Sequence, residues 1–278
     1  MINERDYPIH DWDDAYSNAN YITAGDQYLS RWSTLAAQFK AQLSSTGETF
    51  ITLQYAQSER NTLDLFLPAS PAKGLIVFVH GGYWMMFDKD YWSHLARGAL
   101  ASGYAFAIPS YTLCPQASIG NIVQEIATAI ECAAQQVTGE IRLCGHSAGG
   151  HLVTSMLCQN TPLSDATFAR IVNTLSISGV HDLRVLLNTA LNQKLQLDMA
   201  AASALSPALN MPKGTSSLTC WVGGDERPEF KRQNLLLAQM WKSFAIKTQA
   251  IQEPEKHHFN IIEGLLDADH PMMRALLN

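Results

Sequence analysis

The stretch EIRLCGHSAGGHLV (residues 140–153) joins two apolar segments through a glycine-rich turn. Residues 140–145 have the pattern of a strand, and residues 148–158 have the pattern of a helix. Between them lies GHSAG (residues 145–149), which has the form G-x-S-x-G. Its glycines let strand and helix approach without a clash between Cβ atoms, and the helix N-terminus favours developing negative charge. This context predicts that Ser147 is a catalytic nucleophile rather than an ordinary loop serine.

Strand-like and helix-like segments alternate on both sides of this turn. A hairpin at a sheet edge is expected first, because two alternating segments flank the polar stretch QSERN. Later strand segments are continuous apolar runs, as in strands buried on both faces. The expected strands span 48–56, 61–68, 73–80, 104–111, 140–145, 171–179, 218–224 and 247–253. The expected helices span 25–43, 88–101, 119–137, 148–158, 228–244 and 260–266.

This order predicts an α/β fold: a mostly parallel sheet of about eight strands, with helices on both faces. We find no repeat or linker in the sequence, so residues 1–278 are expected to form one domain. Residues 180–217 are less regular and follow a strand. They are expected to form short helices that act as a small cap facing the substrate.

Composition narrows the class of protein. Of the 278 residues, 47% are hydrophobic and 16% are charged, which indicates a globular chain with a large core. The net charge of −6 argues mildly against nucleic acid or an anionic membrane as a partner. The N-terminal stretch MINERDYPIHDWDD lacks the apolar segment of a secretory signal, and five scattered cysteines are typical of reduced thiols. A cytoplasmic protein that acts on a small molecule is therefore expected.

A second glycine-rich turn, HGGYW (residues 80–84), follows the third predicted strand. Glycines at such a position let backbone N–H groups approach a substrate carbonyl oxygen closely. We therefore predict an oxyanion hole formed by the backbone N–H groups of Gly82, Tyr83 and Ala148. His80 is expected to brace this loop. The bulky residues beside the glycines are expected to line the substrate pocket, with a place in the ordinary core as the alternative: Tyr83, Trp84, Met85 and Met86.

A catalytic acid and a base are expected in that order after the nucleophile. The acid should follow the strand at 218–224, where Asp225 and Glu226 are adjacent and both are candidates. The base should follow the last strand. His258 is preferred to His257 because it lies nearer to the apolar run at 260–266. The chain contains no HExxH motif and no phosphate-binding glycine loop, so neither metal nor cofactor is expected.

Several of these segments together resemble the α/β-hydrolase kynurenine formamidases (arylformamidases) and their bacterial esterase-like relatives. The resemblance rests on AYSNANY, TLDLFLP, HGGYW, GHSAGGHL, PEFKRQ and HHFNIIEGL, and it spans nearly the whole chain. It implies an α/β-hydrolase fold with Glu226 as the acid and His258 as the base. It is compatible with a homodimer. The chain departs from the family pattern at Val185, where proline is common, which affects the expected cap.

The resemblance implies that the substrate is N-formyl-L-kynurenine, cleaved to L-kynurenine and formate by Ser-Glu-His acyl-enzyme catalysis. The alternative is a short-chain carboxylesterase or thioesterase. A membrane-acting lipase is disfavoured by the small cap. A non-catalytic binding protein of the same fold is disfavoured because the chain carries a complete set of serine, acid and histidine with an intact glycine loop.

Overall fold

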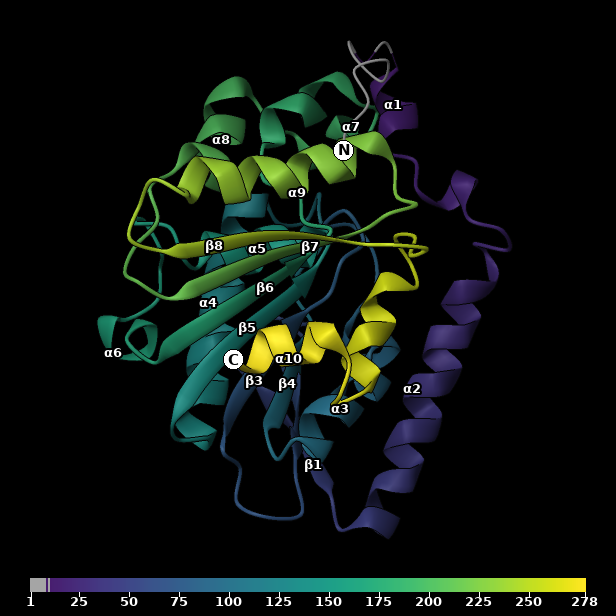
Figure 1. Ribbon diagram of the computed structural model, residues 1–278, viewed down its shortest axis with the longest axis vertical. Helices are drawn as coiled ribbons and strands as arrows, with labels where there is room; N and C mark the ends of the chain where they lie inside the picture. Colours follow the sequence, from purple (N-terminus) through teal and green to yellow (C-terminus); the bar gives the residue numbers. More distant parts are fainter. Residues whose placement is uncertain (1–8, 10) are drawn as a thin grey trace.

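The computed structural model describes residue 9 and residues 11–278. Most of the N-terminal stretch MINERDYPIHDWDD, in which the apolar segment of a secretory signal is lacking, therefore lies outside the described residues. The described part folds around one eight-stranded sheet (Figure 1), in the order β1-β2-β4-β3-β5-β6-β7-β8. The strands are β1 (Thr49–Gln54), β2 (Thr62–Leu67), β3 (Gly74–Val79), β4 (Ala105–Pro109), β5 (Glu140–His146), β6 (Ile171–Ile177), β7 (Ser217–Gly223) and β8 (Lys247–Glu253).

The sheet is mostly parallel. β2 runs antiparallel to both neighbours, β1 and β4, and the pairs from β4 through to β8 are parallel. The predicted α/β class and the N-terminal hairpin are thus confirmed. Burial follows position in the sheet: every residue of the central β3 is buried, whereas every residue of the edge strand β8 is half-buried or exposed.

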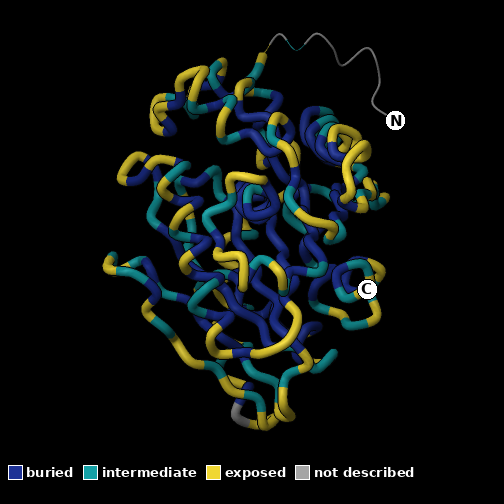
Figure 2. The backbone as a smooth tube through the Cα atoms, turned by 90° about the vertical axis from the view of Figure 1, so that its left-hand side faces the viewer, coloured by how far each residue is buried: buried dark blue, intermediate teal, exposed yellow. Residues whose placement is uncertain are grey.

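Helices cover both faces of the sheet because successive strand residues point to opposite sides. Val77 faces a cluster with α4 (Ile119–Gln136), α5 (Ala148–Ser155) and α9 (Pro228–Trp241), whereas Phe78 faces a cluster with α2 (Gln27–Thr46), α3 (Ala96–Ala101) and α10 (Pro271–Leu277). Figure 1 shows α2 along the right-hand side of the molecule. In Figure 2, buried backbone runs through the centre and exposed residues gather at the periphery.

Several predicted helices are shorter or tighter than expected. The segment 88–101 contains two 3-10 turns before α3, because the backbone of Trp92 (φ −123°, ψ 1°) leaves the helical region. Residues 180–217 form short helices between loops. The remaining elements are α1 (Trp12–Ala15), η2 (Ala19–Tyr21), η3 (Lys89–Tyr91), η4 (Ser93–Leu95), α6 (Asp165–Phe168), η5 (Leu183–Asn188), α7 (Asn192–Leu195), α8 (Met199–Ala204), η6 (Pro207–Leu209) and η7 (Ile261–Leu266).

Within the described residues, no helix is both long and apolar enough to cross a bilayer.

Candidate active site

Ser147 occupies a strained turn between β5 and α5. Its backbone angles are φ 56° and ψ −117°, which a non-glycine residue rarely adopts. The flanking glycines are required by close approach: a Cβ atom on Gly145 would lie 2.2 Å from the carbonyl oxygen of Gly149, and a Cβ atom on Gly149 would lie 1.9 Å from that of Val79. The backbone N–H of Ser147 donates to Ile177 on β6 at 2.8 Å. The turn is therefore fixed to the sheet on both sides.

Glu226 and His258 form a buried pair. Their residues are each only 4% exposed, and Nδ1 of His258 lies 2.7 Å from Oε2 of Glu226. A carboxylate only accepts hydrogen bonds, so Nδ1 carries the proton and Nε2 is left as the basic nitrogen. The other oxygen, Oε1, accepts from the hydroxyl of Ser178 at 2.5 Å and from the N–H of Gly223 at 2.8 Å. Asp225 is exposed, so the structure places Glu226 against the histidine.

The surroundings of His258 hold its ring in place. Its ring centroid lies 4.6 Å from that of Phe230 and 4.6 Å from that of His146. Nε2 of His146 donates to the carbonyl oxygen of His258 at 2.9 Å. Burial lowers the pKa of His146 well below its usual value, so this ring is neutral. His257 instead contacts Tyr28 of α2 through Nε2, at 3.2 Å.

The loop after β3 turns back sharply beside Ser147. Gly82, Tyr83 and Trp84 have positive φ angles of 105°, 53° and 59°. A Cβ atom on Gly81 would lie 2.9 Å from the Cβ atom of Ser147, so only glycine allows this approach. Among the described residues, no hydrogen bond uses the backbone N–H of Gly82, Tyr83 or Ala148. These three donors are available to a ligand.

His80 lies at the base of this loop. It is fully buried, and its carbonyl oxygen accepts from the hydroxyl of Tyr111 at 3.0 Å. The rings of the two residues stack with centroids 4.3 Å apart. Burial lowers the pKa of His80 to about 4, so the ring stays neutral. These contacts hold His80 at the base of the loop.

Ser147, His258, Gly82 and Tyr83 line one cavity of about 430 Å³. Residues between Asn18 and Trp32 form much of the rest of its lining. Figure 1 shows this segment passing along the right-hand side of the molecule between α1 and α2. The aromatic rings that line the cavity are those of Trp32, Tyr83, Phe87, Trp92 and Phe259. In the described part of the chain, no cluster of three or more His, Cys, Asp or Glu side chains could hold a metal ion.

The structure separates the four bulky residues predicted to line the substrate pocket. Tyr83 and Met86 line the cavity with Ser147, whereas Trp84 is 0% exposed and packs edge-on against His151 of α5, in the place that the core alternative gave it. The positive φ angles at residues 83 and 84 turn this indole into the core. Met85 lines a neighbouring cavity of about 410 Å³ and does not line the cavity that holds Ser147.

The lining of the cavity also differs from the expected cap. Residues from 180–217 do not line it, and four residues of that segment, including Ala190 and Leu191, line the neighbouring cavity. The N-terminal wall was missed. Its signal in the sequence is the run of small and aromatic residues AYSNANY (residues 15–21). This composition does not reveal which part of the sheet the segment covers.

A family model and several known proteins match this chain. The BD-FAE family model matches residues 63–213, which is more than half of the chain. Kynurenine formamidase from Danio rerio is 28% identical over 242 residues, covering 84% of this chain and 82% of the relative. Kynurenine formamidase from Salmo salar is 25% identical, covering 94% and 92%.

Solved structures show the same relationship. A protein from Silicibacter sp. TM1040, provisionally named a thioesterase, is 44% identical with a TM-score of 0.90, covering 96% of this chain and 99% of its own. Esterase B from Lactobacillus rhamnosis is 18% identical with a TM-score of 0.65, covering 91% of each chain, and shares the fold. The chain therefore belongs to the BD-FAE family, and it is an α/β-hydrolase enzyme similar to kynurenine formamidases and esterases.

Proposed function

We propose that this enzyme hydrolyses a small acyl or formyl group through an acyl-enzyme, with Ser147 as nucleophile, Glu226 as acid and His258 as base. The proposal is carried by one observation. His258, which is paired with Glu226, lines the same cavity as the strained Ser147 turn. The backbone N–H groups of Gly82, Tyr83 and Ala148 lie beside them and have no acceptor among the described residues. A serine, a histidine and a carboxylate in this relation, with backbone donors nearby, is the arrangement used for acyl transfer.

Each group has a defined task. Nε2 of His258 takes the proton of Ser147 as Oγ attacks the carbonyl carbon of the substrate. The negative charge on the carbonyl oxygen is stabilised by the N–H groups of Gly82, Tyr83 and Ala148, each worth about 3–4 kcal/mol in the transition state. His258 then protonates the leaving amine or alcohol. A water molecule then attacks the acyl-enzyme in the same way, with His258 as the base, and the carboxylic acid is released. Glu226 stabilises the imidazolium form of His258 in both halves of the reaction.

N-formyl-L-kynurenine is our first candidate substrate. Two relatives that cover most of the chain carry the name kynurenine formamidase. The cavity also suits a flat aryl amide, because Trp32 packs against Trp92 with ring centroids 4.7 Å apart and both rings line it. The second candidate is a short-chain ester or thioester. It is supported by 44% identity to the protein provisionally named a thioesterase.

The test compares kcat/KM for N-formyl-L-kynurenine, p-nitrophenyl acetate and an acetyl thioester on one preparation. A value of about 10⁴ M⁻¹s⁻¹ or more for the formamide supports the first candidate. Turnover of the ester or thioester alone supports the second. Ser147→Ala is the control for the mechanism. It should lose at least about 10⁴-fold in kcat on every substrate and lose labelling by a phosphonate, and a folded Ser147→Ala variant with the wild-type rate would refute the serine mechanism.

A further inference from the structure

Two cavities meet at the side chain of Tyr83. The cavity that holds Ser147 measures about 430 Å³, and its neighbour measures about 410 Å³. The two share three lining residues: Asn18, Ala19 and Tyr83. Of these, only Tyr83 carries a large side chain. Its phenol ring is therefore the main bulk between the cavity with the nucleophile and the second cavity, which also contains Met85.

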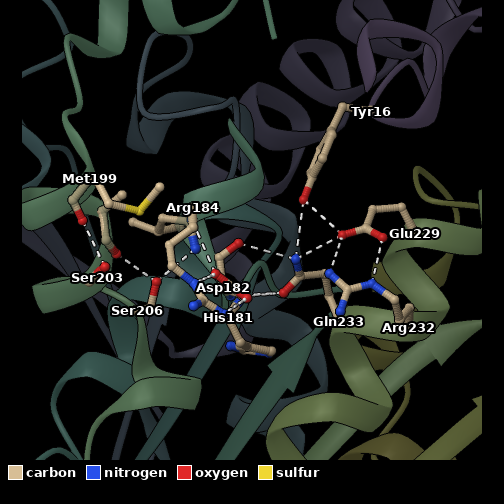
Figure 3. Close-up of polar contacts among 12 residues, drawn as sticks. Tyr16, His181, Asp182, Arg184, Met199, Ser203, Ser206, Glu229, Arg232 and Gln233 are labelled. Atoms are coloured by element: carbon tan, nitrogen blue, oxygen red, sulfur yellow. Dashed lines mark hydrogen bonds and ion pairs between the residues drawn. The ribbon is translucent and has the colours of Figure 1, made fainter. Parts of the chain in front are cut away.

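The ring of Tyr83 is held in position at its far end. Its hydroxyl donates a hydrogen bond to the backbone carbonyl oxygen of Tyr16. Tyr16 is 2% exposed, and its own hydroxyl donates to Oε1 of Glu229 at 3.1 Å and accepts from Nε2 of Gln233 at 3.2 Å. Figure 3 shows the Tyr16 hydroxyl pointing at these two side chains of α9. Arg232 pairs with Glu229 at 2.7 Å, so the attachment includes a compensated buried charge.

Further contacts join this attachment to the rest of the fold. Oε1 of Gln233 accepts from the backbone N–H groups of His181 and Asp182, both at 2.8 Å. Figure 3 shows that Gln233 links α9 to this loop after β6 as well as to Tyr16. The support for the Tyr83 ring therefore comes from three separate parts of the chain, which makes rotation of the ring costly.

We propose that Tyr83 is a specificity-determining residue, a fixed wall that keeps substrates out of the second cavity and limits the enzyme to compact acyl and leaving groups. The proposal rests on the proposed serine hydrolase function and deepens it. Removal of the ring should join the two cavities and admit a longer apolar group. The second cavity is large enough for this, because cavities of about 300–1,000 Å³ hold whole small-molecule ligands.

The backbone at Tyr83 allows a clean test. Its φ of 53° is a conformation that glycine adopts without strain, and asparagine more readily than most residues. Tyr83→Gly and Tyr83→Asn therefore keep the loop conformation and the N–H group proposed for the oxyanion hole. Tyr83→Phe keeps the ring but removes the hydroxyl that bonds to Tyr16, so it separates the bulk of the ring from its attachment. Leu191→Trp adds bulk to the second cavity and lies outside the proposed catalytic groups.

The experiment measures kcat/KM in two substrate series. The first series consists of p-nitrophenyl acetate, butyrate, hexanoate and octanoate, and the second of acetate esters of phenols with longer 4-alkyl chains. Burial of one methylene corresponds to about a fourfold gain in binding. Tyr83→Gly and Tyr83→Asn should raise the ratio of the longest to the shortest substrate at least about tenfold in one series. Tyr83→Phe, which keeps the bulk of the ring and loses only its attachment, should raise the ratio less than about threefold. Adding Leu191→Trp to Tyr83→Gly should remove the gain.

A gain of activity on longer substrates cannot come from misfolding. The inference is overturned if either small-residue variant folds, hydrolyses p-nitrophenyl acetate and keeps the wild-type profile in both series. It is also overturned if Tyr83→Phe alone gives the full gain, because bulk would then not be the cause. Failure of the underlying function is distinguished by Ser147→Ala: if that variant keeps its activity, the serine mechanism fails, whatever the length profiles show.

Discussion

Replacing Glu226 by glutamine tests the geometry of the acid–base pair most directly. Oε2 accepts from Nδ1 of His258 at 2.7 Å, and Oε1 accepts from Ser178 and Gly223 at 2.5 and 2.8 Å. A glutamine amide has one acceptor oxygen and one NH₂ group. In either orientation of the amide, its NH₂ group faces another donor, which is Nδ1 of His258 in one orientation and the N–H of Gly223 in the other. If it faces His258, it favours the tautomer with the proton on Nε2, which cannot accept the serine proton.

The expected loss follows from this tautomer change. A wrong tautomer in a triad of this kind costs about 10⁴-fold in kcat, which corresponds to about 5 kcal/mol of transition-state stabilisation. Asp225→Asn is the matched control, because Asp225 is the adjacent residue and its side chain is exposed. It should change kcat less than about twofold.

The assay is steady-state hydrolysis of p-nitrophenyl acetate by both variants between pH 6 and pH 9, with circular dichroism to show that each variant is folded. A folded Glu226→Gln enzyme within tenfold of wild type would refute the assignment of the acid. A loss of 10⁴-fold in Asp225→Asn would transfer the role to Asp225.

Three further outcomes are expected. Trp84→Phe should lower the free energy of unfolding by about 1–3 kcal/mol in urea titrations and leave KM within twofold, because Trp84 packs in the core. Gly149→Ala should lower the free energy of unfolding by about 3 kcal/mol or more, since the new Cβ atom would lie 1.9 Å from the carbonyl oxygen of Val79. A variant as stable as wild type would contradict this close contact between Gly149 and Val79. Burial lowers the pKa of His80 and His151 to about 4 and that of His181 to about 3. Because the unfolded chain binds these protons near pH 6.5, stability should be complete above pH 6.5 and fall towards pH 4, as measured by urea midpoints at pH 7.5 and pH 5.

The order of strands and helices and the position of the Ser147 turn follow from the amino-acid sequence alone. Both are local properties. Continuous apolar runs such as residues 74–79 can only be buried strands or helices, and their length and flanking glycines indicate strands. The G-x-S-x-G turn is equally local, because the close approach between Gly145 and Gly149 is made within five consecutive residues.

The residues themselves left two adjacent carboxylates open as the partner of His258; the resemblance favoured Glu226, and the tertiary structure brings Glu226 to the histidine. Asp225 and Glu226 are equivalent in type and neighbours in sequence. The difference is that Glu226 reaches the N–H of Gly223 at the end of β7 and the hydroxyl of Ser178 after β6, while Asp225 is exposed. Ser178 is 48 residues from Glu226, and no local pattern specifies that contact.

The walls of the cavity were also decided by tertiary structure. The segment between Asn18 and Trp32 faces Ser147 across more than a hundred residues of chain, and Trp84 enters the core because the backbone around it has positive φ. Periodicity reports which residues are apolar, but it does not report which distant segment they pack against. That choice depends on contacts such as the one between Tyr16 and Tyr83, which form only when the sheet has brought the segments together.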